Sequence, residues 1–171
     1  RMAREASRLY ECLLIAGVSH GDVEAKVIEL YSRPRVSATL ATLPCMSLAG
    51  GSTFDLRQDE NGRRWDFRLA ADRDRARRRI LQEKPFLVVG CPPCTEFSSV
   101  QALNYARLSD EEQQRRWAEA CVLFGFALQI YRLQLAGGRR FLHEHPAGAS
   151  SWQLAEVERL RADPRVGDVA G

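Results

Sequence analysis

The residues that point most directly to chemistry are two cysteines and two prolines that follow a short apolar segment. Residues 90–98 read GCPPCTEFS, and the segment before them, 84–90, has the continuous apolar character of a strand covered on both faces. Ligands of a parallel sheet bind at the carboxyl ends of its strands. The prolines stiffen the turn and restrict where Cys94 can lie. Cys94 is therefore the first candidate for a reactive thiol.

A second polar group ends another expected strand. Residues 139–144 read RRFLHE, and Glu144 is flanked by His143 and His145, with Pro146 next. This is the second place at which an apolar segment is followed directly by side chains that can bind or titrate.

Alternating strand-like and helix-like segments must position these side chains. The expected strands are 26–31, 45–49, 84–90 and 139–144, the second being closed by Gly50 and Gly51. The expected helices are 3–16, 36–43, 70–83, a long helix after Ser109, and 152–161. This alternation predicts an α/β, Rossmann-like fold with a mostly parallel sheet and helices on both faces.

The long helix carries the clearest pattern. Ser109 and Glu112 form a capping box, and Gly137 with Gly138 ends the run. Its apolar residues recur at helical spacing and are predicted to form one core face: Trp117, Cys121, Phe124, Leu128, Tyr131 and Leu135.

Composition bounds the class of protein. With 171 residues, 45% of them hydrophobic, the chain suits one domain, and its net charge of +3 is spread along the sequence, so no overall basic field indicates nucleic acid. No apolar run is long enough to cross a bilayer, and no signal peptide of the usual form is present. The five cysteines are odd in number, which favours a reducing, intracellular setting (cytoplasmic or nuclear). We expect a piece of a longer protein.

Residues 90–98 resemble the nucleophile motif of the DNA cytosine-5 methyltransferases, G-G-P-P-C-Q-x-F-S. Residues 141–146, FLHEHP, are similar to the F-x-x-E-N-V segment of that family, and residues 28–32, IELYS, to its D-L-F-S segment. The order and separations agree over roughly Lys26 to Pro146. The resemblance implies an N-terminal helical extension (1–24) and a methyltransferase-like catalytic domain (25–171), incomplete at its C-terminus.

The resemblance also assigns roles. Cys94 is expected to attack C6 of a cytosine swung out of the DNA duplex, and Glu144 to hold and protonate N3 as general acid. The resemblance thus predicts that neighbouring strands carry Cys94 and Glu144 and that both side chains face one pocket. S-adenosyl-L-methionine is the expected methyl donor. Its site is expected to be lined by Tyr31, Ser32, Asp55, Leu56, Asp66, Phe67 and Pro93. Asp55 would take the ribose hydroxyls, Leu56 would cover the adenine, and Asp66 with Phe67 would meet the adenine amino edge.

The chain departs from the family pattern in three places. Arg33-Pro34-Arg35 replaces the glycine-rich cofactor loop, in which glycines let the backbone approach the cofactor. His145 and Pro146 replace the Asn-Val step after the glutamate. Nothing resembles the Q-x-R-x-R segment or a target-recognition domain.

Four other interpretations of these residues remain open. The chain could be a catalytically silent module that keeps the fold. Cys91-x-x-Cys94 could be a thioredoxin-type redox dithiol, or could bind zinc together with His143 and His145. An arginine run in the helix 70–83 could contact phosphates, although such a run is usually a solvated helix face: Arg73, Arg75, Arg77, Arg78 and Arg79.

Overall fold

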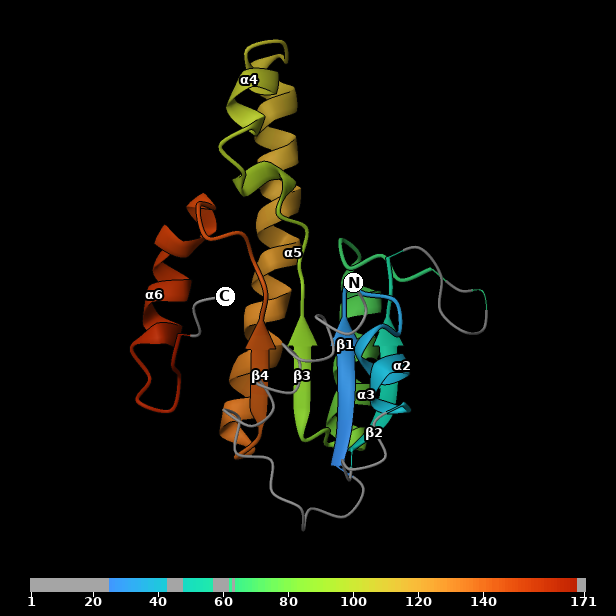
Figure 1. The fold of residues 1–171 in the computed structure, drawn as a ribbon. Coiled ribbons are helices and arrows are strands. Elements are labelled where there is room, and N and C mark those ends of the chain that lie inside the picture. Colours follow the sequence, from blue (N-terminus) through green and yellow to red (C-terminus); the bar gives the residue numbers. More distant parts are fainter. Residues whose placement is uncertain (1–24, 43–47, 57–61, 63, 169–171) are drawn as a thin grey trace.

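The centre of the molecule is a four-stranded parallel sheet (Figure 1). The computed structural model describes residues 25–42, 48–56, 62 and 64–168, so the predicted helical extension at 1–24 lies outside the described residues. The strands are β1 (Ala25–Leu30), β2 (Leu48–Phe54), β3 (Leu87–Gly90) and β4 (Arg140–His143), in the order β2-β1-β3-β4. All three neighbouring pairs are parallel, which confirms the predicted fold class.

Helices cover both faces of this sheet: α2 (Val36–Leu40) on one face, and α3 (Ala70–Glu83) and α5 (Asp110–Ala136) on the other. Two shorter helices, α4 (Gln101–Tyr105) and α6 (Ala155–Arg161), lie beside α5. Two short 3-10 turns, Thr95–Phe97 and Ser150–Gln153, lie in the connections that follow β3 and β4. Figure 1 shows α3 and α5 behind the sheet and α2 in front of it.

The alternation of side chains along each strand divides the core into two layers. Ile28, Leu30 and Val88 point to the face where buried residues of α3 and α5 pack. Val27, Leu87 and Val89, one residue out of step, point to the other face, against Leu40 of α2. The predicted helices on both faces are therefore present.

The predicted end of the second strand was wrong. The sequence placed it at 45–49 with Gly50 and Gly51 as its end, whereas β2 runs through both glycines to Phe54. A Cβ at Gly50 would lie 2.7 Å from the Cβ of Ser37 in α2. The glycine therefore marks the close approach of a helix to an edge strand and does not end the strand. Residues 45–47 lie outside the described residues.

Other bounds also differ from the predictions. The first strand covers 25–30 where 26–31 was predicted, and the fourth covers 140–143 where 139–144 was predicted. The strand expected from 84 begins at Leu87, because Lys84 takes a left-handed conformation (φ 45°) at the end of α3 and Pro85 follows it. The helix expected over 152–161 divides into a 3-10 turn and α6. The short helix α4 was not predicted from the sequence.

Helix α5 is the longest element and confirms the predicted cap. The side chain of Ser109 accepts a hydrogen bond from the backbone N–H of Glu112 at 3.3 Å. The N-terminal half of α5 extends past the carboxyl ends of the strands, where α4 packs beside it (Figure 1). Trp117 lies on that half and is 38% exposed, so its predicted place in the core was only partly right.

Among the described residues, no helix combines the length and apolar character needed to span a membrane.

Candidate functional site

The two polar segments predicted to meet leave the sheet side by side. In the register of β3 and β4, Gly90 pairs with His143, and the N–H of Glu144 donates to the carbonyl of Gly90 at 3.0 Å. The chain order reverses between β1 and β3, because β2 lies on one side of β1 and β3 on the other. The carboxyl edge at such a reversal is the usual ligand site of an open α/β sheet.

Cys94 lies in the loop after β3, directly before the 3-10 turn Thr95–Phe97. Its side chain is half-buried, and both Cys94 and Cys91 are free thiols. The N–H of Phe97 donates to the Cys94 carbonyl at 3.0 Å, and Ser150 donates its hydroxyl to the Phe97 carbonyl at 3.3 Å. The loop that carries Cys94 is thus held to the loop that follows Glu144.

A cluster of rings anchors both loops to α5. His143 and His145 stack with ring centroids 5.4 Å apart, and both meet Phe124 of α5 edge-on at 5.3 Å. Phe97 contacts Phe124 and His145, and Trp152 closes the cluster against His143. The histidines of the HEHP segment therefore pack inward, away from the Glu144 side of the strand.

Each histidine is oriented by one hydroxyl group. Tyr131 contacts Nδ1 of His143 at 3.0 Å, and Ser151 contacts Nδ1 of His145 at 2.7 Å. Burial lowers the pKa of His143 to about 4 and also lowers that of His145, so both rings are neutral at pH 7. Across the described part of the chain, no three or more His, Cys, Asp or Glu side chains are arranged to hold a metal.

The thiol that the structure sets against Glu144 is Cys91. Cys91 packs with Val89 and Leu142 on the α2 side of the sheet, and Glu144 follows Leu142 by two residues. Burial and the charges of Glu144 and Glu29 raise the pKa of Cys91 to about 12. That Cys91 neighbours Glu144 was not predicted from the sequence. The available signal was the alternation of side chains along paired strands, which directs residues 87, 89 and 91 of one segment and residues 142 and 144 of the other to the same face.

Glu29 is a second residue that the sequence did not single out. It is 1% exposed at the end of β1, and its carboxylate accepts bonds from the N–H of Arg35 at 3.1 Å and of Ser37 at 2.9 Å. The Ser37 hydroxyl donates to it at 3.0 Å. Glu29 therefore holds the Arg33-Pro34-Arg35 loop and the start of α2 in place. Buried carboxylates generally need such donors.

The predicted cofactor residues after β1 point in different directions. Tyr31 takes a left-handed conformation (φ 68°), and its hydroxyl donates to the Leu123 carbonyl of α5 at 2.6 Å. The half-buried side chain of Tyr31 packs against the core, and burial raises the pKa of its hydroxyl well above the ordinary value. The half-buried Ser32 donates its hydroxyl to the carbonyl of Arg33 at 2.8 Å.

Asp55 and Leu56 follow β2 at the same carboxyl edge. Asp55 is 7% exposed and forms an ion pair with Arg33, with 3.6 Å between Nε and Oδ2. Leu56 and Pro93 are half-buried. An arginine of the loop that replaces the glycine-rich segment thus reaches the carboxylate expected to hold the ribose.

Asp66 and Phe67, the last two predicted cofactor residues, lie in the segment before α3. Two guanidinium N–H groups of Arg68 donate to the Asp66 carboxylate at 2.9 and 2.8 Å, and this interaction lowers the pKa of Asp66. Phe67 is fully buried and packs edge-on against Tyr31 at 5.2 Å. The Phe67 side chain is therefore part of the core, and the predicted adenine contact would fall to Asp66.

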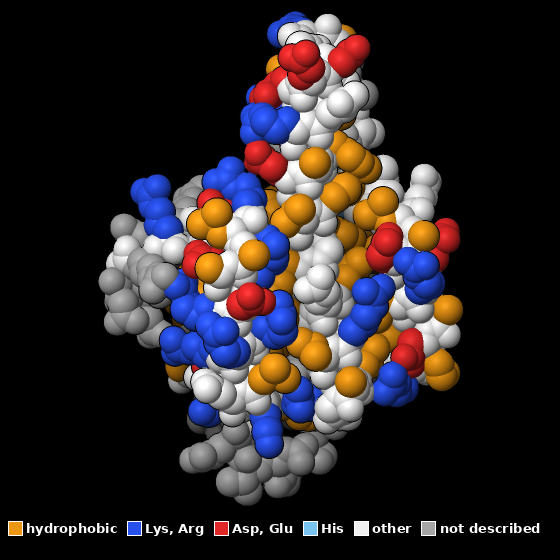
Figure 2. All heavy atoms as spheres, turned by 180° about the vertical axis from the view of Figure 1, so that it is seen from behind, with side chains coloured by type: hydrophobic (Ala, Val, Ile, Leu, Met, Phe, Trp, Pro, Cys, Tyr) orange, Lys and Arg blue, Asp and Glu red, His pale blue; other side chains and the backbone are white. Residues whose placement is uncertain are grey.

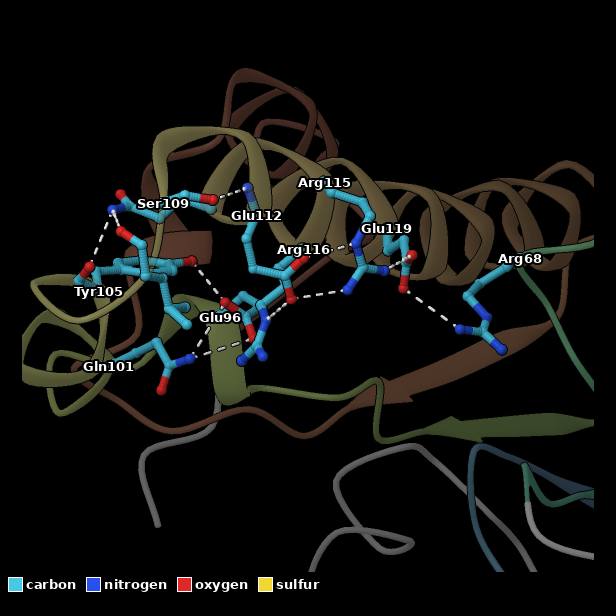
Figure 3. Close-up of polar contacts among 11 residues, drawn as sticks. Arg68, Glu96, Gln101, Tyr105, Ser109, Glu112, Arg115, Arg116 and Glu119 are labelled. Atoms are coloured by element: carbon cyan, nitrogen blue, oxygen red, sulfur yellow. Dashed lines mark hydrogen bonds and ion pairs between the residues drawn. The ribbon is translucent and has the colours of Figure 1, made fainter.

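Polar side chains tie α4 to the turn that follows Cys94, and α5 to the segment before α3 (Figure 3). Tyr105 of α4 donates its hydroxyl to Glu96 at 2.6 Å. Glu96 lies in the 3-10 turn that directly follows Cys94. Further along α5, Glu119 pairs with Arg115, and with Arg68 from the segment before α3 at 3.4 Å. This bracing keeps the arm formed by α4 and the first half of α5 beside the site.

The arginines of α3 gather on the back of the molecule (Figure 2). Three of them are paired within the helix: Arg75 with Asp72, Arg77 with Asp74 and Arg79 with Glu83. Arg75 also lies over the ring of Trp65 at 4.0 Å. The sequence pattern favours a solvated helix face for this run; in the structure, intrahelical pairs balance much of its charge.

No protein-family model, curated protein or solved structure matches this chain.

Proposed function

We propose that this chain transfers a methyl group from S-adenosylmethionine to C5 of cytosine in DNA, through a covalent adduct on Cys94. The observation that carries the proposal is the side-by-side exit of the Cys94 loop and Glu144 from β3 and β4, where the Glu144 N–H bonds the Gly90 carbonyl. The motif likeness at 90–98 and 141–146 supplies the chemistry.

In this mechanism the Cys94 thiolate attacks C6 of the base, and an S–C6 bond forms while the ring electrons move toward N3 and C5. Glu144 gives a proton to N3, so that the ring does not carry the full negative charge. S-adenosylmethionine supplies an electrophilic methyl group for C5. N3 then returns its proton to Glu144. When a base removes the C5 proton, the S–C6 bond breaks and the Cys94 thiolate is regenerated.

The residues at the edge of the sheet fit the cofactor in two respects. Asp55 offers a carboxylate at the end of β2, the position at which ribose hydroxyls are held in sheets of this kind. Arg33, 62% exposed in its side chain, offers a cation for the carboxylate of the cofactor. The Arg33–Asp55 pair must open for both contacts to form.

The test is covalent trapping on mixed-sequence duplex DNA that contains 5-fluorodeoxycytidine. Fluorine at C5 cannot leave as a cation, so the adduct accumulates once the methyl group is transferred. We expect a methylated protein–DNA adduct with the native chain and with Cys121→Ala, a matched control on α5. We expect none with Cys94→Ala. An adduct that survives in Cys94→Ala, mapped to another residue by mass spectrometry, would contradict the assignment of the nucleophile.

A second candidate is a module that keeps this fold without catalysis. The Arg33–Asp55 ion pair favours it, because the pair occupies the carboxylate that the cofactor needs. Glu29 likewise takes the loop N–H groups of Arg35 and Ser37. Absence of both the adduct and calorimetric heat at high micromolar S-adenosylmethionine would favour this candidate.

The dithiol alternative has weaker support. A redox-active cysteine pair works through a thiolate of lowered pKa. The surroundings of Cys91 act in the opposite direction, since burial and two nearby carboxylates raise its pKa.

A further inference from the structure

We propose that Cys91 is a positioning residue for Glu144: its S–H donates to the Glu144 carboxylate and fixes which oxygen is left for the base. This inference rests on the proposed function, in which Glu144 meets N3 of cytosine. Cys91 is the first cysteine of residues 90–98, and it is neither the nucleophile nor the acid in the proposed mechanism.

The strand register brings the two residues together. Gly90 of β3 pairs with His143 of β4, so the next residues, Cys91 and Glu144, continue from paired positions at the edge of the sheet. The Glu144 N–H reaches back to the Gly90 carbonyl, and the Cys91 N–H bonds the carbonyl of Leu30 at 3.2 Å. The backbone of both residues is thus held on the sheet.

Side-chain direction places both residues on one face. Cys91 continues the series of Leu87 and Val89 toward α2, and Glu144 continues from Leu142. The residues before them, Gly90 and His143, face the opposite layer, where Tyr131 lies against both. The thiol and the carboxylate therefore share a face from which the His143 ring is excluded.

The charges around Cys91 favour Glu144 as its acceptor. Glu144 and Glu29 flank the thiol from β4 and β1, Arg35 faces it from the start of α2, and Tyr131 approaches from α5. The Glu29 carboxylate already accepts three hydrogen bonds from Arg35 and Ser37. Because burial and the neighbouring carboxylates oppose its ionisation, the Cys91 thiol keeps its proton. The S–H group can therefore donate a hydrogen bond to the Glu144 carboxylate, although a thiol is a weak donor.

The first test measures the pKa of Glu144 itself, by carbon-13 NMR of the side-chain carboxyl groups in the full chain. The signal is assigned as the one lost in Glu144→Gln. Removing a donor from a carboxylate disfavours its charged form, so Cys91→Ala should raise the pKa of Glu144 by roughly half a unit. Cys91→Ser keeps a hydroxyl donor, so the pKa of Glu144 in that variant should equal the native value or lie below it.

The matched control is Cys121→Ala, whose half-buried thiol lies on α5 near Glu156. It should leave the titration of Glu144 unchanged. Urea unfolding of each variant ensures that only folded protein is titrated, and Cys91→Val is a second non-donor should the alanine variant fold poorly. A Glu144 pKa that stays the same in both non-donor variants overturns the proposal.

The second test uses methyl transfer to mixed-sequence duplex DNA. Cys91→Ala should shift the limb of the kcat–pH profile that depends on Glu144 to higher pH, and Cys91→Ser should restore it. A uniform fall in kcat without that shift would indicate a merely structural role and would also overturn the proposal. If no chain methylates DNA, the proposed function fails, whereas the NMR result still decides whether Cys91 controls Glu144.

Discussion

At the scale of single residues, the site depends on how closely Tyr131 of α5 packs against Gly90 at the end of β3. Gly90 has no side chain, and the Tyr131 hydroxyl occupies the space where one would be: a Cβ there would lie 2.0 Å from Oη and 2.8 Å from Cζ. Tyr131 is fully buried, so its ring cannot swing away. The same hydroxyl orients His143. The glycine before the cysteines is therefore required by packing.

We predict that Gly90→Ala lowers the free energy of unfolding by about 2–3 kcal/mol, the usual cost of forcing extra atoms into a packed core. Tyr131→Phe alone should cost about 1 kcal/mol, for the lost bond to His143. The double variant should be more stable than the sum of the single costs implies, because the phenylalanine ring lacks the clashing oxygen. Urea unfolding of the four proteins measures this coupling. Strictly additive costs would show that Oη is not the obstacle.

At the scale of elements, α5 has two halves with different support. Its buried residues begin at Ala120 and continue to Leu135, where the helix crosses the sheet. The first half, beyond the sheet, depends on the Ser109 cap, on pairs such as Glu112 with Arg115 and Arg116, and on α4. Exposed ion pairs of this kind contribute little each. The arm beside Cys94 should therefore open more readily than the rest of the helix.

We predict that Ser109→Ala weakens the first turns of α5 by about 1 kcal/mol, the usual contribution of a serine N-cap. Hydrogen exchange read by mass spectrometry should show faster exchange in residues 110–118 and unchanged exchange in 124–135. Ser109→Asn, which keeps a capping oxygen, serves as the control and should exchange like the native chain. Equal acceleration along all of α5 would mean that the helix opens as one unit.

At the scale of the whole molecule, the His143–His145 cluster joins elements that are distant in the sequence. It connects the ends of β3 and β4 to α5 and to the turn that precedes α6. The rings pack as neutral groups, so protonating them opposes the folded state. Folding stability should therefore depend on pH through these two residues.

The pKa of His143 is about 4 in the folded chain and about 6.5 when it is unfolded. The unfolded chain then binds more protons between these values, so stability is full above about pH 6.5 and falls as the pH drops toward 4. We predict a loss of at most ~3 kcal/mol from this residue. His143→Asn, which does not titrate, should have a flatter urea-unfolding profile between pH 7.5 and 4.5. Parallel profiles for the two proteins would contradict the prediction.

Much of the fold followed from local sequence patterns. The continuous apolar strands, the alternation of strands with helices, and the cap and periodicity of α5 each depend on residues near one another in the chain. Such patterns also located the Cys94 loop and Glu144 at strand ends. They could not show that Gly50 and Gly51 lie inside β2, because the neighbours of these glycines belong to other elements: Ser37 lies against Gly50, and Ile28 and Glu83 lie against Gly51.

The sequence by itself determined the class of fold, the strand-end position of Cys94 and Glu144, and the inward face of α5. Only the tertiary structure decided that Cys91 is the thiol against Glu144, that Arg33 reaches Asp55, and that Phe67 is a core ring. The physical reason is that these contacts depend on strand order and register. The crossover connections and the packing of both side-chain layers together set the strand order and register, so no single segment of the sequence encodes these contacts.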